Sequence, residues 1–213
     1  MQTPPNHYHG GTFHVDLADP LWKLEKALQN IKLQERKKDF TKRVWACDVN
    51  PLHGTWKKFY TGTYGALWAS MQICGQSKLH LYEILLEDRY KKLYLDIEFC
   101  GKLNGTIKVP DVWWAVREVF AEELASMFGV DVKSCDFLVL ESKPAPKDKP
   151  MKRSAHMILN NRNLAFLEPH LIKAVVKAIV DSPRMTQFMV RNFVGSMTSM
   201  IDTAVYGRNR PFR

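Results

Sequence analysis

Apolar residues recur along the chain with two spacings, which predict helices and strands in alternation. Leu21, Leu24, Leu28 and Ile31 fall on one face of a helix, which we expect to open at Asp19-Pro20 because proline is favoured at the first helical position. The same spacing predicts helices at 63–71, 111–128, 168–182 and 186–194. Apolar and aromatic runs predict strands at 43–49, 55–60, 79–86, 92–99, 136–141, 154–159 and 200–205. These strands are not the continuous Val/Ile runs of a parallel sheet, so the pattern favours an α+β fold with mixed or antiparallel sheets.

The strand at 92–99 carries two carboxylates, Asp96 and Glu98, in an otherwise apolar run. Residues two apart project from the same face of a strand, roughly 6–7 Å from each other. Two neighbouring negative charges are costly unless a cation neutralises them, and Mg²⁺ and Mn²⁺ prefer such oxygen ligands. The alternative is an edge strand whose polar face meets water.

Two later segments add further polar side chains that suit phosphate or metal binding. In the strand at 154–159, Ser154 and His156 share a face and Lys152 precedes them, a set that suits a phosphate tail. Asp202 supplies a third carboxylate at a strand end. Taken alone, Ser154 and His156 are more typical of a half-exposed strand whose polar side chains only form hydrogen bonds. Asp202 alone is typical of a turn cap.

The last seven residues, 207–213, contain three arginines: Arg208, Arg210 and Arg213. Guanidinium groups suit bidentate phosphate binding, although a solvated basic end is the simpler interpretation. The formal net charge of +9 also favours a polyanionic partner, and nucleic acid or a nucleotide is the first candidate.

The remaining composition narrows the class of protein. No apolar run approaches the length of a membrane span, and the first twenty residues contain no Lys or Arg. We therefore expect an intracellular protein without a membrane partner, and nucleus, mitochondrion and viral replication site are not distinguished. The four cysteines are scattered, which predicts neither a zinc ribbon nor a disulfide framework.

Together these motifs resemble the archaeo-eukaryotic primase (AEP) superfamily, most closely its PrimPol branch. Members carry an Asp-x-Glu motif, a Ser-x-His motif and a third Asp that opens an Asp-x-x-Val-Tyr-x-x-Asn-Arg-x-Phe-Arg signature. The chain reads Asp202-Thr-Ala-Val-Tyr-Gly-Arg-Asn-Arg-Pro-Phe-Arg213 at that place. The resemblance spans roughly residues 56–213.

The polar, Pro- and Gly-containing residues 1–20 predict a disordered tail. The resemblance implies an AEP-type catalytic core over 21–213. An N-terminal α/β module at about 21–90 and an RRM-like module at about 91–213 would have the active site in the cleft between them. Asp96, Glu98 and Asp202 would bind two Mg²⁺ or Mn²⁺ ions. Lys152, Ser154, His156, Arg210 and Arg213 would bind the nucleotide, and Lys58 and Arg208 the nucleic acid.

The implied activity is a template-dependent DNA primase/polymerase that uses dNTPs or rNTPs on single-stranded or primed DNA. Single-strand-binding proteins or a helicase are possible partners. PrimPol relatives usually continue with a zinc-binding module, which is associated with making the first dinucleotide. No such module is visible in the sequence up to Arg213, so we expect this chain to extend primers more readily than it starts them. A two-metal nuclease and a non-catalytic single-strand binder that stacks bases on Trp113, Tyr206 and Phe212 remain open alternatives.

Overall fold

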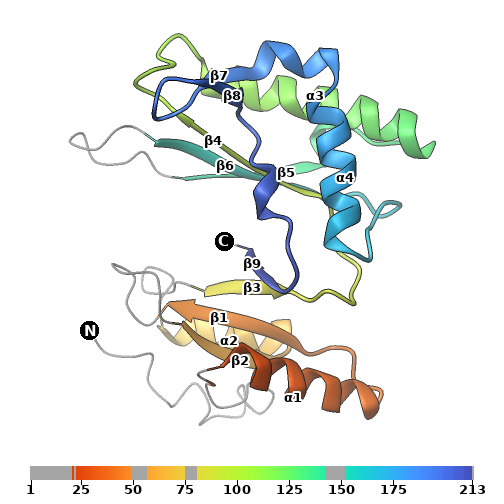
Figure 1. The fold of residues 1–213 in the computed structure, drawn as a ribbon. Coiled ribbons are helices and arrows are strands. Elements are labelled where there is room, and N and C mark those ends of the chain that lie inside the picture. Colours follow the sequence, from red (N-terminus) through yellow and green to blue (C-terminus); the bar gives the residue numbers. More distant parts are fainter. Residues whose placement is uncertain (1–20, 22, 49–56, 75–80, 143–151, 213) are drawn as a thin grey trace. The chain divides into compact units, whose positions relative to one another are not determined.

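The computed structural model describes residues 21, 23–48, 57–74, 81–142 and 152–212, and the chain divides into two compact units (Figure 1). The first unit is Met1–Leu86 with Asn209–Arg213, and the second is Glu87–Arg208. The sequence predicted a single module from about residue 91 to residue 213. The last strand belongs instead to the first unit, because its backbone pairs there.

The first unit is a four-stranded sheet with two helices. Its strands follow the order β2-β1-β3-β9, and each neighbouring pair is antiparallel. The elements are α1 (Leu24–Arg36), β1 (Arg43–Asp48), β2 (Lys57–Gly62), α2 (Tyr64–Cys74), β3 (Leu81–Leu85) and β9 (Arg210–Phe212).

Strand β1 is buried on both faces, because successive side chains of a strand point to opposite sides. Val44 belongs to a cluster that includes Ile31 of α1. Trp45 belongs to a second cluster that includes Ala66 of α2. This central strand therefore holds both helices of the unit.

Helix α1 begins later than the sequence predicted. It starts at Leu24, whereas the backbone of Leu21 exchanges two 2.7 Å hydrogen bonds with Phe59 of β2. Leu21 thus packs with the apolar stripe of α1 from an extended conformation, which the periodicity of apolar residues does not distinguish from a helical one. Asp19 and Pro20 lie outside the described residues.

The second unit contains a three-stranded antiparallel sheet in the order β4-β6-β5, a separate β7–β8 hairpin and two long helices. The elements are β4 (Tyr94–Cys100), α3 (Val109–Phe128), β5 (Phe137–Glu141), β6 (Lys152–Leu159), α4 (Pro169–Val180), β7 (Met189–Arg191) and β8 (Met197–Ser199), with 3₁₀-helices at Ser134–Asp136, Pro183–Phe188 and Thr203–Val205. The predicted α+β class with antiparallel sheets is confirmed. Within the described ranges, no helix is long and apolar enough to cross a bilayer.

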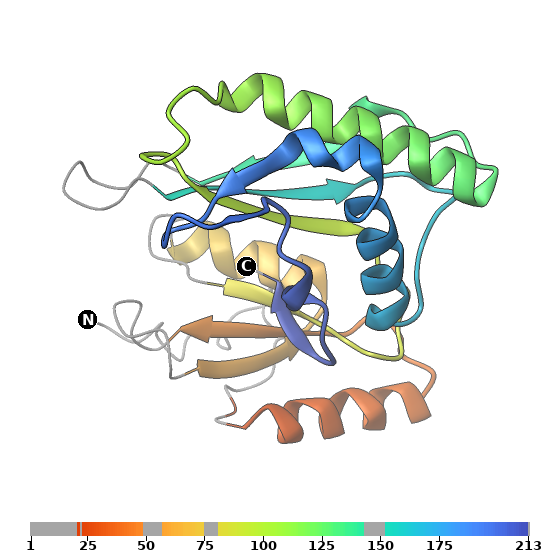
Figure 2. The ribbon, with the colours of Figure 1, turned by 45° about the horizontal axis from the view of Figure 1, so that its top comes forward.

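One face of this sheet is apolar and lies against helices. Leu95, Ile97 and Phe99 of β4 are fully or almost fully buried on that face, and the Phe99 ring meets Trp113 of α3 edge-on at 6.0 Å. Figure 2 shows α3 running along the sheet. The alternate residues, Asp96 and Glu98, consequently share the opposite face.

The predicted helix at 186–194 is wrong. A 3₁₀-helix ends at Phe188, and the chain then forms the β7–β8 hairpin. Met185 and Phe188 are buried three residues apart, a spacing that fits one turn of either helix type. The hairpin follows because Gly195 adopts φ +86° at its turn, a conformation that costs glycine little.

Candidate active site

The candidate site is built on the polar face of β4. In register, Asp96 of β4 lies opposite His156 of β6, and Glu98 lies opposite Ser154. Asp96 Oδ1 is 3.6 Å from His156 Nε2, and Glu98 forms an ion pair with Lys152. The antiparallel pairing of two short strands therefore brings the Asp-x-Glu and Ser-x-His motifs side by side.

Asp202 reaches the same face from the other side of β4. Ile201 forms an antiparallel bridge with Ile97, the Asp202 amide donates to the Asp96 carbonyl at 2.8 Å, and the Glu98 amide donates to the Met200 carbonyl at 2.8 Å. Strand β4 thus lies between β6 on one side and residues 200–202 on the other. The three carboxylates come from segments about a hundred residues apart in the sequence.

The Asp202 carboxylate also caps a turn, which was the simpler interpretation of this residue. Its Oδ1 accepts a 2.7 Å hydrogen bond from the Ala204 amide at the start of the last 3₁₀-helix. Four residues after Asp202, the Tyr206 hydroxyl donates to the Tyr94 carbonyl at 2.6 Å. Capping and bonding together hold Asp202 beside β4, so the structural role of this residue is compatible with a chemical one.

Burial and mutual repulsion disfavour charge at the centre of the site. Burial is the largest cause that raises the pKa of Asp96, and the charges of Glu98 and Asp202 raise it further, against the opposing effect of His156. Burial likewise lowers the pKa of His156, with Lys152 adding to the effect and Asp96 opposing it. At 3.6 Å the Asp96–His156 contact is longer than a hydrogen bond. An added cation at the carboxylates would relieve the repulsion among them.

The donor chemistry fits a hard divalent cation, but the side chains as they stand do not enclose one. Among the described residues, no three His, Cys, Asp or Glu side chains converge closely enough to hold a metal ion. Glu98 is turned toward Lys152 and Asp202 toward the Ala204 amide. In each case the contact uses one carboxylate oxygen, so the other oxygen of each carboxylate could still bind a metal.

Of the four other predicted site residues, two belong to the first unit, one belongs to the second unit and one lies outside the described residues. Lys58 is in β2 of the first unit, opposite Cys47 in register. Arg208 belongs to the second unit, where its Nε lies 2.8 Å from Glu87 Oε1 at the surface. Arg210 lies in β9 of the first unit, and Arg213 lies outside the described residues.

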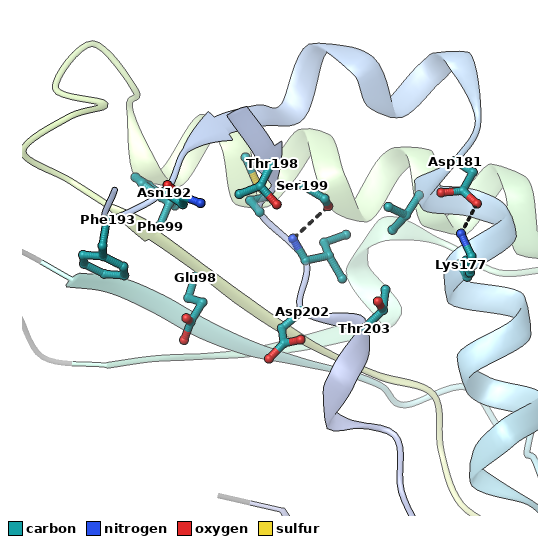
Figure 3. A pocket seen from close by; sticks show the side chains of 13 residues that line it. Glu98, Phe99, Lys177, Asp181, Asn192, Phe193, Thr198, Ser199, Asp202 and Thr203 are labelled. Atoms are coloured by element: carbon teal, nitrogen blue, oxygen red, sulfur yellow. Dashed lines mark hydrogen bonds and ion pairs between the residues drawn. The ribbon is translucent and has the colours of Figure 1, made fainter. Parts of the chain in front are cut away.

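A pocket of about 470 Å³, which was not predicted from the sequence, lies beside the carboxylates. Figure 3 shows Glu98 and Asp202 at one edge of it and the Lys177–Asp181 ion pair, at 2.5 Å, at another. Its lining includes Glu98, Lys177, Asp181, Asn192, Phe193, Thr198, Ser199, Asp202 and Thr203. The Asn192–Gly195 stretch, between short apolar segments, was a hairpin signal that would have pointed to it.

With this geometry described, comparison with known proteins identifies the family. Residues 54–212 match the family described as the C962R protein N-terminal AEP domain, and the chain therefore belongs to the archaeo-eukaryotic primase superfamily. It is also 26% identical over 188 residues to a DNA-directed primase/polymerase protein of Danio rerio. That alignment covers 73% of this chain and 35% of the relative, so the chain spans about a third of the relative's length.

Proposed function

We propose that the protein is a template-dependent nucleotidyltransferase that adds nucleotides to a 3′-hydroxyl on DNA. The observation that carries the proposal is the junction of Asp96, Glu98 and Asp202 with Lys152, Ser154 and His156 on one face of β4 and β6. Family membership over residues 54–212 and the similarity to a DNA-directed primase/polymerase protein of Danio rerio support the same activity.

Each group has a role in such a reaction. The three carboxylates, Asp96, Glu98 and Asp202, would hold Mg²⁺ or Mn²⁺. A bound cation would neutralise the negative charge on the attacking and leaving oxygens. Lys152, Ser154 and His156 would bind the triphosphate, since a cation, a hydroxyl and an imidazole can all donate to phosphate oxygens. Arg210 and Arg213 remain candidates for triphosphate or template phosphates. The substrates would be dNTPs or rNTPs on a single-stranded or primed template, with helicases or single-strand-binding proteins as partners.

The two alternatives explain less of the site. A nuclease accounts for the carboxylates but not for the Ser-x-His strand that pairs with them in register. A non-catalytic binder leaves the three carboxylates unexplained, and two of the rings expected to stack bases, Trp113 and Tyr206, are only 4% and 6% exposed. These two rings belong to the interior, and the Phe212 side chain is not described.

The test is primer extension on a primed single strand with dNTPs, rNTPs, Mg²⁺ and Mn²⁺ varied separately. Asp96→Asn with Glu98→Gln preserves side-chain shape and removes the charges. We expect extension to fall at least about 100-fold, because the groups act on charge that develops in the transition state. Glu141→Gln is the matched control: this exposed carboxylate lies on the same sheet, on the opposite face to His156. Primer shortening in place of extension would favour the nuclease, and retention of the strand without extension would favour a binding module.

A further inference from the structure

The pocket beside Glu98 and Asp202 lies on a defined side of the carboxylates. Strand β4 has β6, with Lys152, Ser154 and His156, on one side. On its other side lie residues 200–202, and the pocket is lined by these and by the preceding β8. The proposed phosphate-binding groups and the pocket therefore flank the carboxylates from opposite sides.

We propose that this pocket binds the nucleoside that carries the attacking 3′-hydroxyl, that is, the primer terminus. In nucleotidyl transfer the 3′-oxygen bonds to the α-phosphorus as the bond to the pyrophosphate oxygen breaks, and the hydroxyl proton passes to solvent. Attacking and leaving oxygens lie roughly in line across the phosphorus. If the leaving pyrophosphate lies over β6, the attacking nucleoside must approach from the pocket side. This inference rests on the proposed function.

The pocket has the size and the chemistry of a nucleoside site. Its volume of about 470 Å³ is within the usual range for small-molecule sites. Thr198, Ser199 and Thr203 contribute hydroxyl groups, which suit the sugar. Ser199 Oγ already accepts a 3.0 Å hydrogen bond from the Ile201 amide, so its own hydrogen is left to donate outward.

Phe193 supplies the aromatic surface for the terminal base. Its side chain lines the pocket and is 47% exposed, unlike the buried Trp113 and Tyr206. The hairpin that carries it is tied down: Asn192 Oδ1 accepts from the Val194 and Ser196 amides at 3.1 and 3.0 Å. A ring held on such a turn loses little conformational entropy when a base stacks on it.

The experiment measures the KM for primed template and the KM for the incoming nucleotide in Phe193→Ala, Phe193→Trp and Val194→Ala. Stacking on an aromatic side chain predicts a primer KM raised about 5- to 100-fold in Phe193→Ala, with the nucleotide KM within about twofold of wild type. Phe193→Trp should restore the primer KM. Val194→Ala is the matched control on the same turn, since Val194 is 84% exposed and does not line the pocket.

A primer with an abasic 3′-terminal residue adds a readout of direct contact. If Phe193 stacks on the terminal base, removing the ring and removing the base delete the same contact. The two changes together should then raise the primer KM by less than the product of their separate effects. Additive effects, an equal loss in Val194→Ala, or a rise confined to the nucleotide KM would each overturn the inference. A wild-type protein that extends no primer would instead refute the proposed function itself, and the pocket assignment with it.

Discussion

Tyr206 is the residue that joins the third carboxylate segment to the core. Its ring packs against Tyr94 with 5.0 Å between centroids, and its hydroxyl donates to the Tyr94 carbonyl at 2.6 Å. Tyr206→Phe keeps the ring and leaves that carbonyl without this donor. We expect a loss of about 1–2 kcal/mol in the free energy of unfolding, measured by urea denaturation. Burial raises the pKa of this hydroxyl well above its usual value, so the loss should not depend on pH near neutrality.

The control for this substitution is Tyr90→Phe in the same unit. Tyr90 is 76% exposed, so removal of its hydroxyl should leave the free energy of unfolding unchanged within error. Equal losses in the two variants would show that the bond to the Tyr94 carbonyl contributes nothing specific.

At the residue scale, the sequence predicted which residues belong to the site, but not which side chains form ion pairs with one another. Asp96, Glu98, Ser154 and His156 were recognised because alternation along a strand fixes which residues share a face. The ion pair between Glu98 and Lys152 was not predicted. It depends on the strand register, in which Cys100 lies opposite Lys152. These two strands are far apart in the sequence, so no short turn fixes their register.

At the scale of elements, a polar cluster joins α2 to β3 in the first unit. The Tyr64 hydroxyl of α2 donates to Glu83 of β3 at 2.9 and 3.0 Å, and Arg43 Nε lies 3.8 Å from the same carboxylate. Burial raises the pKa of Glu83, and the bond from Tyr64 and the charge of Arg43 only partly oppose it. Burial and Glu83 raise the pKa of Tyr64 to about 12.

The sign of the pH effect follows from these pKa shifts. A carboxyl whose pKa is raised on folding binds its proton more tightly in the native state, so its contribution to stability falls as pH rises above 4.5, its unfolded value. Glu83→Gln keeps an acceptor for Tyr64 and carries no charge. We expect its stability relative to wild type to increase from pH 5 to pH 8, measured by urea denaturation at both values. Glu25→Gln, at an exposed position in the first turn of α1, is the control for loss of a carboxylate alone. A decrease in Glu83→Gln would reverse the assigned sign.

Elements defined by local signals were predicted well, and those defined by distant pairing were not. Helix α3 ends at Gly129 in the left-handed conformation, φ 64°, as the glycine predicted. Strand β9, by contrast, is three residues long and exists through its pairing with β3, more than a hundred residues earlier. The hairpin at 189–199 was not predicted, for a related reason. The spacing of its apolar residues also fits a helix, and only the turn at Gly195 distinguishes the two.

For the whole molecule, the net charge of +9 is the property that bears most directly on the proposed partner. A cationic protein that contacts phosphates releases counterions from the strand, so affinity falls as salt rises. With three to five phosphates contacted, the slope of log K against log salt should be roughly −2 to −4 on single-stranded DNA, measured by fluorescence anisotropy. A methylphosphonate strand of the same bases, which carries no backbone charge, is the control and should bind with a slope near zero. If both strands bind alike and neither responds to salt, the charge does not serve nucleic-acid binding. The site on β4 would then have to recruit its substrates through the nucleotide alone.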